Sequence, residues 1–204
     1  GKKNEELEIG QSAFHRESSR LESLRNMAER YDGYGNSIRK VMEQKKNVPG
    51  IEGVVADLIK VDQRYETAIE TALGGSIQNI VTENEDTAKE LIEYLKKNRF
   101  GRATFLPLTS VGGRGGFAKP EALKEKGAIG LASTLIRADK KYDRVVQHLL
   151  GRVLVAEHID DAIRIARKYK HSIFIVTLEG ESLSPGGSMT GGAFRNSSNL
   201  LGRK

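Results

Sequence analysis

The sequence predicts a mixed α/β (α+β) fold made of two similar lobes, each with mixed sheet and helices, and flanked by a coiled-coil stub. Three observations predict it. A block of residues occurs twice along the chain, strand-like apolar runs alternate with helical segments in each copy, and residues 5–31 follow a seven-residue apolar period.

The composition is that of a globular protein with charged helix attached. The 204 residues are 38% hydrophobic and 29% charged, and no run of about 18 apolar residues is present. The lack of cysteine excludes disulfides and thiolate metal sites and fits a reducing cytosol. The net charge of +6 permits nucleic-acid binding, but solvated helix faces explain many lysines equally well. The abrupt ends predict a piece of a longer protein.

The N-terminal segment predicts a coiled-coil helix. Its apolar residues at coiled-coil spacing are Leu7, Phe14, Leu21, Leu24, Ala28 and Tyr31. Gly10 and Glu17 interrupt this seam, so an ordinary amphipathic helix remains an alternative. Residues 32–36 then predict a turn, and a second helix is expected over residues 37–46 with Asn36 or Ser37 as its cap.

The internal repeat defines the two lobes. Residues 53–74 align without a gap on residues 130–151, and seven of the 22 positions are identical. The similarity continues beyond this block, after a deletion of three residues in the second copy. We expect lobe 1 at residues 47–110 and lobe 2 at residues 120–194.

Each copy predicts a helix, a strand, a second helix and a final strand. In lobe 1 these elements are expected at residues 63–73, 77–82, 85–98 and 103–108. In lobe 2 they are expected at residues 140–150, 153–156, 160–170 and 173–178. The repeated Asp62 and Asp139 are interpreted as helix caps, and the repeated Tyr65 and Tyr142 as packed rings.

The remaining segments connect the lobes to each other and to the ends. Residues 1–46 are assigned to the coiled-coil stub with its second helix, and residues 195–204 to the start of a C-terminal arm. Residues 111–119 form a glycine-rich connector. The four glycines around Arg114 favour a mobile connector over a phosphate-binding loop, since no helix begins directly behind them.

Catalytic motifs are lacking. The chain contains neither the phosphate-binding motif G-x-x-x-x-G-K-[ST] nor a G-x-G-x-x-G motif followed by a helix. Ser184 and Ser188 do not lie in the G-x-S-x-G sequence that exposes a nucleophilic serine. The histidines show no metal-ligand spacing; they are His15, His148, His158 and His171. We therefore expect no enzyme activity, no catalytic residue, no metal and no cofactor in this chain.

The sequence SPGGSMTGG at residues 184–192 contains two glycine pairs directly after an apolar run. Glycine costs a strand about 0.5–1 kcal/mol relative to alanine, so the pairs indicate close approach by something else. A phosphate group, another segment of the chain and a second copy of it all remain candidates.

The motifs ALGG, GRATFLPL and PGGSMTGG, in this order within two similar lobes, resemble the hinge domain of bacterial structural maintenance of chromosomes (SMC) proteins. The resemblance covers residues 31–204. It implies a hinge that interrupts a long antiparallel coiled coil and joins two chains, lobe 1 against lobe 2, in an ATPase of chromosome condensation and segregation. The ATPase heads, and the kleisin and accessory subunits that bind them, would lie outside this chain, in a cytoplasmic protein associated with the nucleoid.

The resemblance also assigns site residues. Those at the dimer interface would be Gly74, Gly75, Gly186, Gly187, Gly191 and Gly192. Nonspecific DNA binding, the family's second property, has candidate phosphate contacts in Lys45, Lys46, Lys96, Lys97, Arg99 and Arg102. Lysines that complement a helix dipole are an equally weighted interpretation. The alternative function is a two-lobed regulatory domain that binds a phosphate or small ligand.

Overall fold

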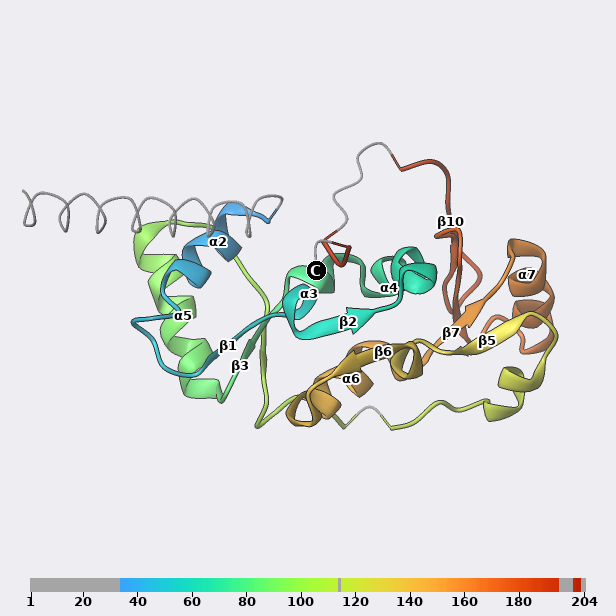
Figure 1. The fold of residues 1–204 in the computed structure, drawn as a ribbon, viewed down its shortest axis with the longest axis horizontal. Coiled ribbons are helices and arrows are strands. Elements are labelled where there is room, and N and C mark those ends of the chain that lie inside the picture. Colours follow the sequence, from blue (N-terminus) through green and yellow to red (C-terminus); the bar gives the residue numbers. More distant parts are fainter. Residues whose placement is uncertain (1–33, 114, 195–199, 203–204) are drawn as a thin grey trace, which may run out of the picture. The chain divides into compact units, whose positions relative to one another are not determined.

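The computed structural model describes residues 34–113, 115–194 and 200–202. The chain divides into two compact units, residues 1–35 and residues 36–204, and every helix and strand discussed here belongs to the second (Figure 1). The predicted coiled-coil seam over residues 5–31 lies outside the described residues.

Lobe 1 begins with a helix and is built around a three-stranded sheet. The helices are α2 (Asn36–Glu43), α3 (Val55–Leu58), α4 (Glu66–Leu73) and α5 (Glu85–Asn98), with short 3-10 helices η1 (Gln63–Tyr65) and η2 (Gly74–Gln78). The strands are β1 (Ile51–Val54), β2 (Ile59–Val61), β3 (Ile80–Thr82) and β4 (Phe105–Pro107). The sheet order is β1-β3-β4, with β1 antiparallel and β4 parallel to β3.

Lobe 2 repeats this order of elements and extends the sheet. Its helices are α6 (Asp143–Leu150) and α7 (Ile159–Lys168), with 3-10 helices η3 (Pro120–Lys124), η4 (Ala132–Leu135) and η5 (Lys140–Tyr142). Its strands are β5 (Ala128–Leu131), β6 (Ile136–Ala138), β7 (Val153–Ala156), β8 (Phe174–Thr177), β9 (Ser182–Leu183) and β10 (Met189–Thr190). The sheet order is β10-β9-β8-β7-β5, so β9 and β10 are an addition that lobe 1 lacks.

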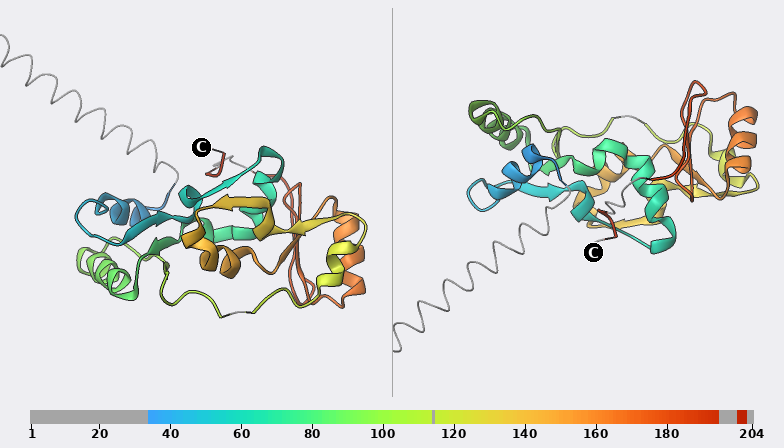
Figure 2. Two further views of the ribbon diagram at one scale, coloured as in Figure 1. Left: turned by 60° about the horizontal axis from the view of Figure 1, so that its bottom comes forward. Right: turned by 90° about the horizontal axis from the view of Figure 1, so that it is seen from above.

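The two lobes are joined by their own repeated strands. β2 and β6 pair antiparallel and lie side by side in Figures 1 and 2. Lys60 pairs with Arg137, which is its own counterpart 77 residues later, and Ile59 and Val61 pair with Ala138 and Ile136. A local two-fold axis therefore passes through the Lys60–Arg137 pair.

Buried apolar side chains form the core of each lobe. In lobe 1 the amphipathic α5 places Leu91 and Leu95 against the sheet, and the Asn84 side chain caps it by accepting from the backbone N–H of Thr87 at 2.9 Å. In lobe 2 the corresponding cluster centres on Leu154, Ile165 and Ile175.

Polar contacts between the lobes surround the β2–β6 pair. Arg137 donates to Asp62 at 3.0 Å, and Glu52 on β1 accepts from Lys141 at 3.0 Å and from the Tyr142 hydroxyl at 3.1 Å. The hydrogen bond to Glu52 raises the pKa of Lys141, while burial, followed by Glu52, raises the pKa of Tyr142. These contacts fix lobe 1 to lobe 2 on the side of β1.

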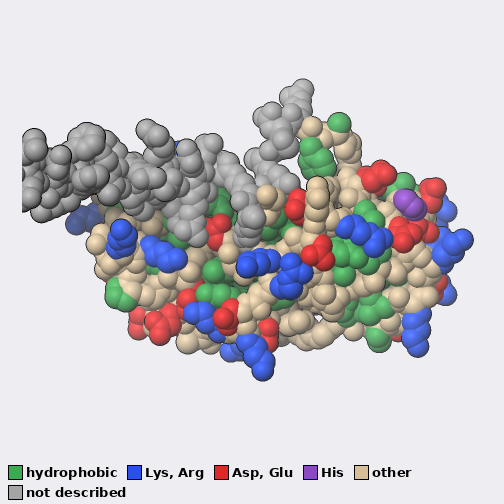
Figure 3. Space-filling view, in the orientation of Figure 1, with side chains coloured by type: hydrophobic (Ala, Val, Ile, Leu, Met, Phe, Trp, Pro, Cys, Tyr) green, Lys and Arg blue, Asp and Glu red, His purple; other side chains and the backbone are tan. Residues whose placement is uncertain are grey.

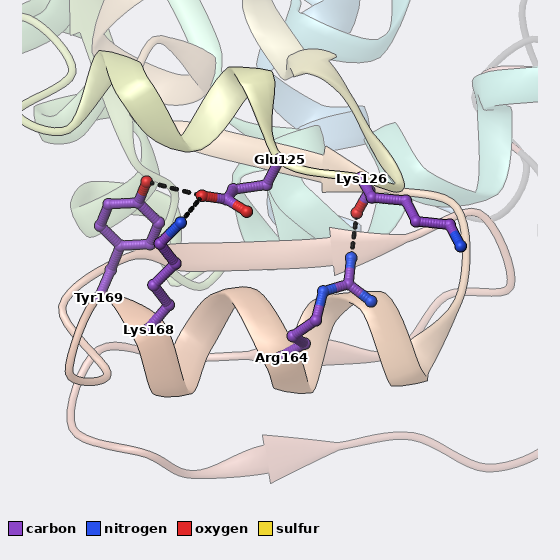
Figure 4. A network of polar contacts seen from close by, with 5 residues as sticks. All are labelled: Glu125, Lys126, Arg164, Lys168 and Tyr169. Carbon is purple, nitrogen blue, oxygen red and sulfur yellow. Dashed lines mark hydrogen bonds and ion pairs between the residues drawn. The ribbon is translucent and has the colours of Figure 1, made fainter.

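A second network holds the start of lobe 2 against α7 (Figure 4). Glu125 accepts hydrogen bonds from Lys168 and, at 3.2 Å, from the Tyr169 hydroxyl, and Arg164 donates to the Lys126 carbonyl. The hydrogen bond from Lys168 is the main reason that the pKa of Glu125 lies below its usual value. The segment between η3 and β5 is thus fastened to the helix beneath it.

Several expected elements differ in extent from those observed. The segment before the first helix of each lobe, for which no element is predicted above, contains two strands and a helical turn. Each first helix then begins as a 3-10 turn. The strand predicted at residues 77–82 covers Ile80–Thr82, because Gly74–Gln78 form a 3-10 helix. Asp139 caps its helix by accepting from the Lys141 N–H, but the cap predicted at Asp62 is wrong, since Asp62 bonds to Arg137 instead.

The predicted caps of the second helix are also used differently. The Ser37 hydroxyl donates to the Arg102 carbonyl at 2.6 Å, and the Asn36 amide donates to the Phe100 carbonyl at 3.3 Å. These bonds tie the start of α2 to the chain just beyond α5. The helix itself covers Asn36–Glu43 rather than residues 37–46.

Candidate functional site

The second glycine-rich segment forms a hairpin at the edge of lobe 2. β9 and β10 pair antiparallel, and β10 is the last strand of the five-stranded sheet. Three backbone bonds shape the turn: Gly186 N–H to the His171 carbonyl at 2.8 Å, Gly187 to Ser184 at 2.9 Å, and Ser184 to Ser188 at 2.9 Å. The hairpin therefore presents a fixed open strand edge.

This hairpin and the residues after it are exposed. Every residue from 185 to 194 is exposed, and among the described large hydrophobic residues Met189 (53%) and Phe194 (67%) are the most exposed. An open strand edge with exposed apolar side chains is a template for pairing with another chain. Sequence reasoning did not single out Met189 or Phe194, because apolar residues in a strand-like segment are expected to be buried.

The glycines of the hairpin leave their backbone accessible. A Cβ added at Gly186 or Gly192 would meet nothing within 4 Å, and one at Gly187 would only touch His171 at 3.9 Å. Gly191 differs, since its Cβ would lie 3.0 Å from the Glu181 side chain. The space above these residues is open to an approaching backbone.

The glycine pair of lobe 1 lies at the end of α4. Gly74 adopts φ +53° and donates its N–H to the Glu70 carbonyl, which ends the helix. Both Gly74 and Gly75 are exposed, and neither has any atom within 4 Å of an added Cβ. Like the hairpin glycines, they offer bare backbone at the surface.

The sheet of lobe 1 also has an open edge. β4 occupies the position in lobe 1 that β8 occupies in lobe 2, because both lie parallel to the central strand of the repeat. β8 is covered by β9, whereas β4 ends its sheet. The chain thus has one lobe with an added hairpin and one lobe without it.

The C-terminal residues dock on α4. Leu200 and Leu201 are buried, and the Leu201 N–H donates to the Glu70 carboxylate at 3.2 Å. Burial raises the pKa of Glu70, opposed by the Leu201 bond and reinforced by the charge of Glu66. Glu70 therefore contacts both the C-terminal segment, through its carboxylate, and the interface candidate Gly74, through its carbonyl.

The predicted phosphate contacts fall into two groups in lobe 1. Lys96, Lys97 and Arg99 end α5, where Arg99 adopts the left-handed conformation, and Arg102 follows closely. Lys45 and Lys46 lie beyond the other end of α2, whose eight residues span about 12 Å. All six are exposed. On the face drawn in Figure 3, basic side chains are interspersed with acidic ones.

The described residues contain neither a metal-ligand cluster nor a membrane-spanning helix. No group of three or more histidine or carboxylate side chains is placed there to hold a metal ion. None of the helices in the described ranges combines the length and apolar character needed to cross a membrane.

Comparison with known proteins identifies close relatives. Residues 48–166 match the family described as SMC proteins Flexible Hinge Domain. The chain is 45% identical to the chromosome partition protein Smc of Desulfitobacterium hafniense and 43% identical to that of Bacillus subtilis, over 93% and 91% of its length. It spans 16% of the length of each of these relatives.

Solved structures agree with these matches. A crystal structure of an asymmetric dimer of the Geobacillus stearothermophilus SMC hinge domain superposes with a TM-score of 0.80 at 39% identity, covering 97% of this chain and 81% of that one. The Pyrococcus furiosus SMC hinge domain gives a TM-score of 0.66 at 34% identity, covering 84% of this chain and 87% of that one. The mixed α/β fold of two lobes predicted from the sequence is confirmed.

Proposed function

Because the chain belongs to the SMC flexible hinge domain family, we propose that it is a homodimerisation module whose two copies join through their open sheet edges. The β10 edge and hairpin glycines of one copy would meet β4 and the Gly74–Gly75 loop of its partner. The interface would then include the six predicted glycines at residues 74, 75, 186, 187, 191 and 192.

The observation that carries this proposal is the open β10 edge, flanked by bare glycine backbone and by exposed Met189 and Phe194. Pairing would satisfy the unused N–H and C=O groups of the edge and bury the two apolar side chains. Glycine at the flanks allows the partner's backbone to approach without a side chain in between.

The difference between the two lobes favours a closed dimer over a growing chain. Among the described strands, the end of the lobe 2 sheet that carries the hairpin, at β10, corresponds to the bare end of the lobe 1 sheet, at β4. A two-fold axis would let each copy offer its hairpin to the bare β4 end of the other, so both of these ends are used within one closed pair.

The mass of the chain in solution tests this proposal. Sedimentation equilibrium at micromolar concentration is expected to give twice the 22.5 kDa of one chain. A mass that stays at one chain throughout, or that rises without limit with concentration, would contradict a closed dimer.

The wider role is proposed from the relatives, of whose length this chain is a small part. In a full-length chromosome partition protein, the hinge would join two antiparallel coiled-coil arms in the cytoplasm near the nucleoid. ATP binding and hydrolysis would belong to head regions outside this chain, together with the kleisin and accessory contacts, and the hinge itself would not be catalytic.

We further propose that lobe 1 binds DNA without sequence preference. The support is the group of exposed cations at the end of α5, which lies beside the start of α2 with Arg39 and Lys40. Lys40 lies 4.9 Å from the centre of the Phe100 ring, so this end of the lobe combines cations with one aromatic side chain. Phosphate contacts of this kind release counterions, so binding would weaken steeply with salt.

Changing Lys96 and Lys97 together to glutamate is expected to weaken binding to a DNA duplex. If each lysine contacts a phosphate, the slope of log affinity against log salt becomes shallower by about two. Fluorescence anisotropy with a labelled duplex at several salt concentrations measures both quantities.

The matched control is Lys124→Glu with Lys126→Glu in lobe 2, which changes the net charge equally at two exposed lysines. Equal loss of affinity in both double variants would show that only overall charge matters, and would refute a site on α5. Both variants are expected to remain dimers.

A further inference from the structure

A surface cavity of about 660 Å³ lies where lobe 1, the connector and lobe 2 meet. Lobe 1 contributes Ser76 from η2, the connector contributes Phe117 and Lys119, and lobe 2 contributes its remaining walls from α6, β7, β8 and the hairpin turn. Ligand pockets in proteins typically have volumes of about 300–1,000 Å³ and often lie between domains. The cavity has the size and position of a small-molecule site.

The charged groups around the cavity have one sign. Among the described residues, its lining includes the cationic Lys119 and Arg152 and the imidazole of His148, and neither an aspartate nor a glutamate. Lys119 comes from the connector and Arg152 from the turn between α6 and β7, so cations approach from two segments. A lining of this kind attracts an anion, and a guanidinium can bind a phosphate through two parallel hydrogen bonds.

The rest of the lining suits a flat apolar group and hydroxyl contacts. Phe117 packs against the lobe 2 core and Phe174 begins β8, so both rings are held by the fold. Ser76 and Ser172 add hydroxyls at the same cavity. The cations suit the phosphate of a nucleotide, and the two aromatic rings suit its flat base.

Hydrogen bonds hold two parts of the cavity wall in place. Pro185, which lines the cavity, precedes Gly186, whose N–H is bonded to the His171 carbonyl at 2.8 Å. Ser172 donates its hydroxyl to the Tyr169 carbonyl at 2.6 Å. A site whose walls are fixed before binding loses less entropy when its ligand enters.

We propose that this cavity binds a phosphate-bearing small molecule of mononucleotide size, with its phosphate at Lys119 and Arg152 and its flat group at Phe117 or Phe174. The glycine-rich connector, GGRGG at residues 112–116, is not itself the phosphate site; it delivers Phe117 and Lys119 to the cavity. Ser76 follows Gly75 and Pro185 precedes Gly186, so the ligand would lie directly beside the residues proposed to join two chains.

Isothermal titration calorimetry of the whole chain with AMP, without metal ions, tests the proposal. Saturable binding of one AMP per chain is expected, with at least tenfold weaker affinity in Arg152→Glu and in Lys119→Glu. Lys89→Glu is the matched control, because Lys89 is an exposed lysine on α5 that does not line the cavity. Ala118→Trp, which fills the cavity without changing charge, is expected to abolish binding.

Three outcomes would overturn the proposal. One is no saturable heat with the unaltered chain, and another is equal weakening by Lys89→Glu. A third is binding only to a monomeric variant such as Gly75→Trp, because the partner chain would then fill the cavity in the dimer. Sedimentation of the same samples separates this test from the proposed dimerisation: Arg152→Glu is expected to lose AMP and remain a dimer.

Discussion

Replacing Gly75 by tryptophan is expected to convert the proposed dimer into monomers, raising the dissociation constant at least 100-fold, which corresponds to about 3 kcal/mol. Within the chain the substitution should cost little, because Gly75 has no left-handed φ and an added Cβ meets no atom within 4 Å. The indole would instead occupy the space where the partner's backbone approaches. Sedimentation equilibrium of the variant measures the change.

Gly116→Trp in the connector is the matched control for this experiment. Gly116 also lacks a left-handed φ and also has open space around its Cβ, but it lies outside the predicted interface. If Gly75→Trp leaves the dimer intact, or if Gly116→Trp dissociates it equally, the interface assignment is wrong. Gly186, Gly187 and Gly192 are poorer probes, since at φ between +97° and +128° any side chain would also strain the fold.

Replacing Gly127 by alanine is expected to destabilise the chain by about 3 kcal/mol. Gly127 has φ +84°, and its added Cβ would lie 2.6 Å from the Cβ of Asp161 on α7. Its carbonyl accepts a hydrogen bond from the N–H of Glu157, the residue directly after β7, at 2.8 Å. The turn therefore cannot move away from Asp161 without breaking this bond. Urea denaturation followed by circular dichroism measures the loss.

Gly113→Ala separates the two contributions. Gly113 has nearly the same φ, +80°, but its Cβ would meet nothing within 4 Å, so only the backbone cost of about 1–2 kcal/mol is expected. Equal losses in the two variants would show that the contact with Asp161 adds nothing, contrary to the packing described here.

Much of the fold was predictable from the sequence. The repeat showed that the chain has two similar lobes, and helices of 10 or more residues can be recognised from their periodic apolar positions. The helix at residues 85–98 and the strand at residues 153–156 were predicted with the bounds observed. The strands of three or four residues before each first helix were missed, since so short a run has no usable period. Asp62 shows a different limit: a partner 75 residues away outweighed its local role as a cap.

The candidate site was only partly predictable for a similar reason. The glycine pairs are local features of the sequence and lie at exposed backbone, although their place in an interface stays a prediction. The open edges at β4 and β10 depend on the order of strands in each sheet, which no local pattern contains. The repeat did contain one signal of backbone conformation. Gly50 and Gly127 correspond at the offset of 77, and both adopt a positive φ.

The pairing of β2 with β6 has a bearing on ancestry. Each strand faces its own duplicate, so a single-lobe ancestor could have formed the same two-stranded ribbon with an identical molecule, and duplication with fusion would have made that contact permanent. The Lys60–Arg137 pair is consistent with such an origin. In a symmetric pair of strands, the residue on the two-fold axis pairs with its own copy, so a basic residue at that position lies opposite another basic residue. The aspartates two positions later, Asp62 and Asp139, would have been retained as the neutralising charges, and Asp62 still binds Arg137 today.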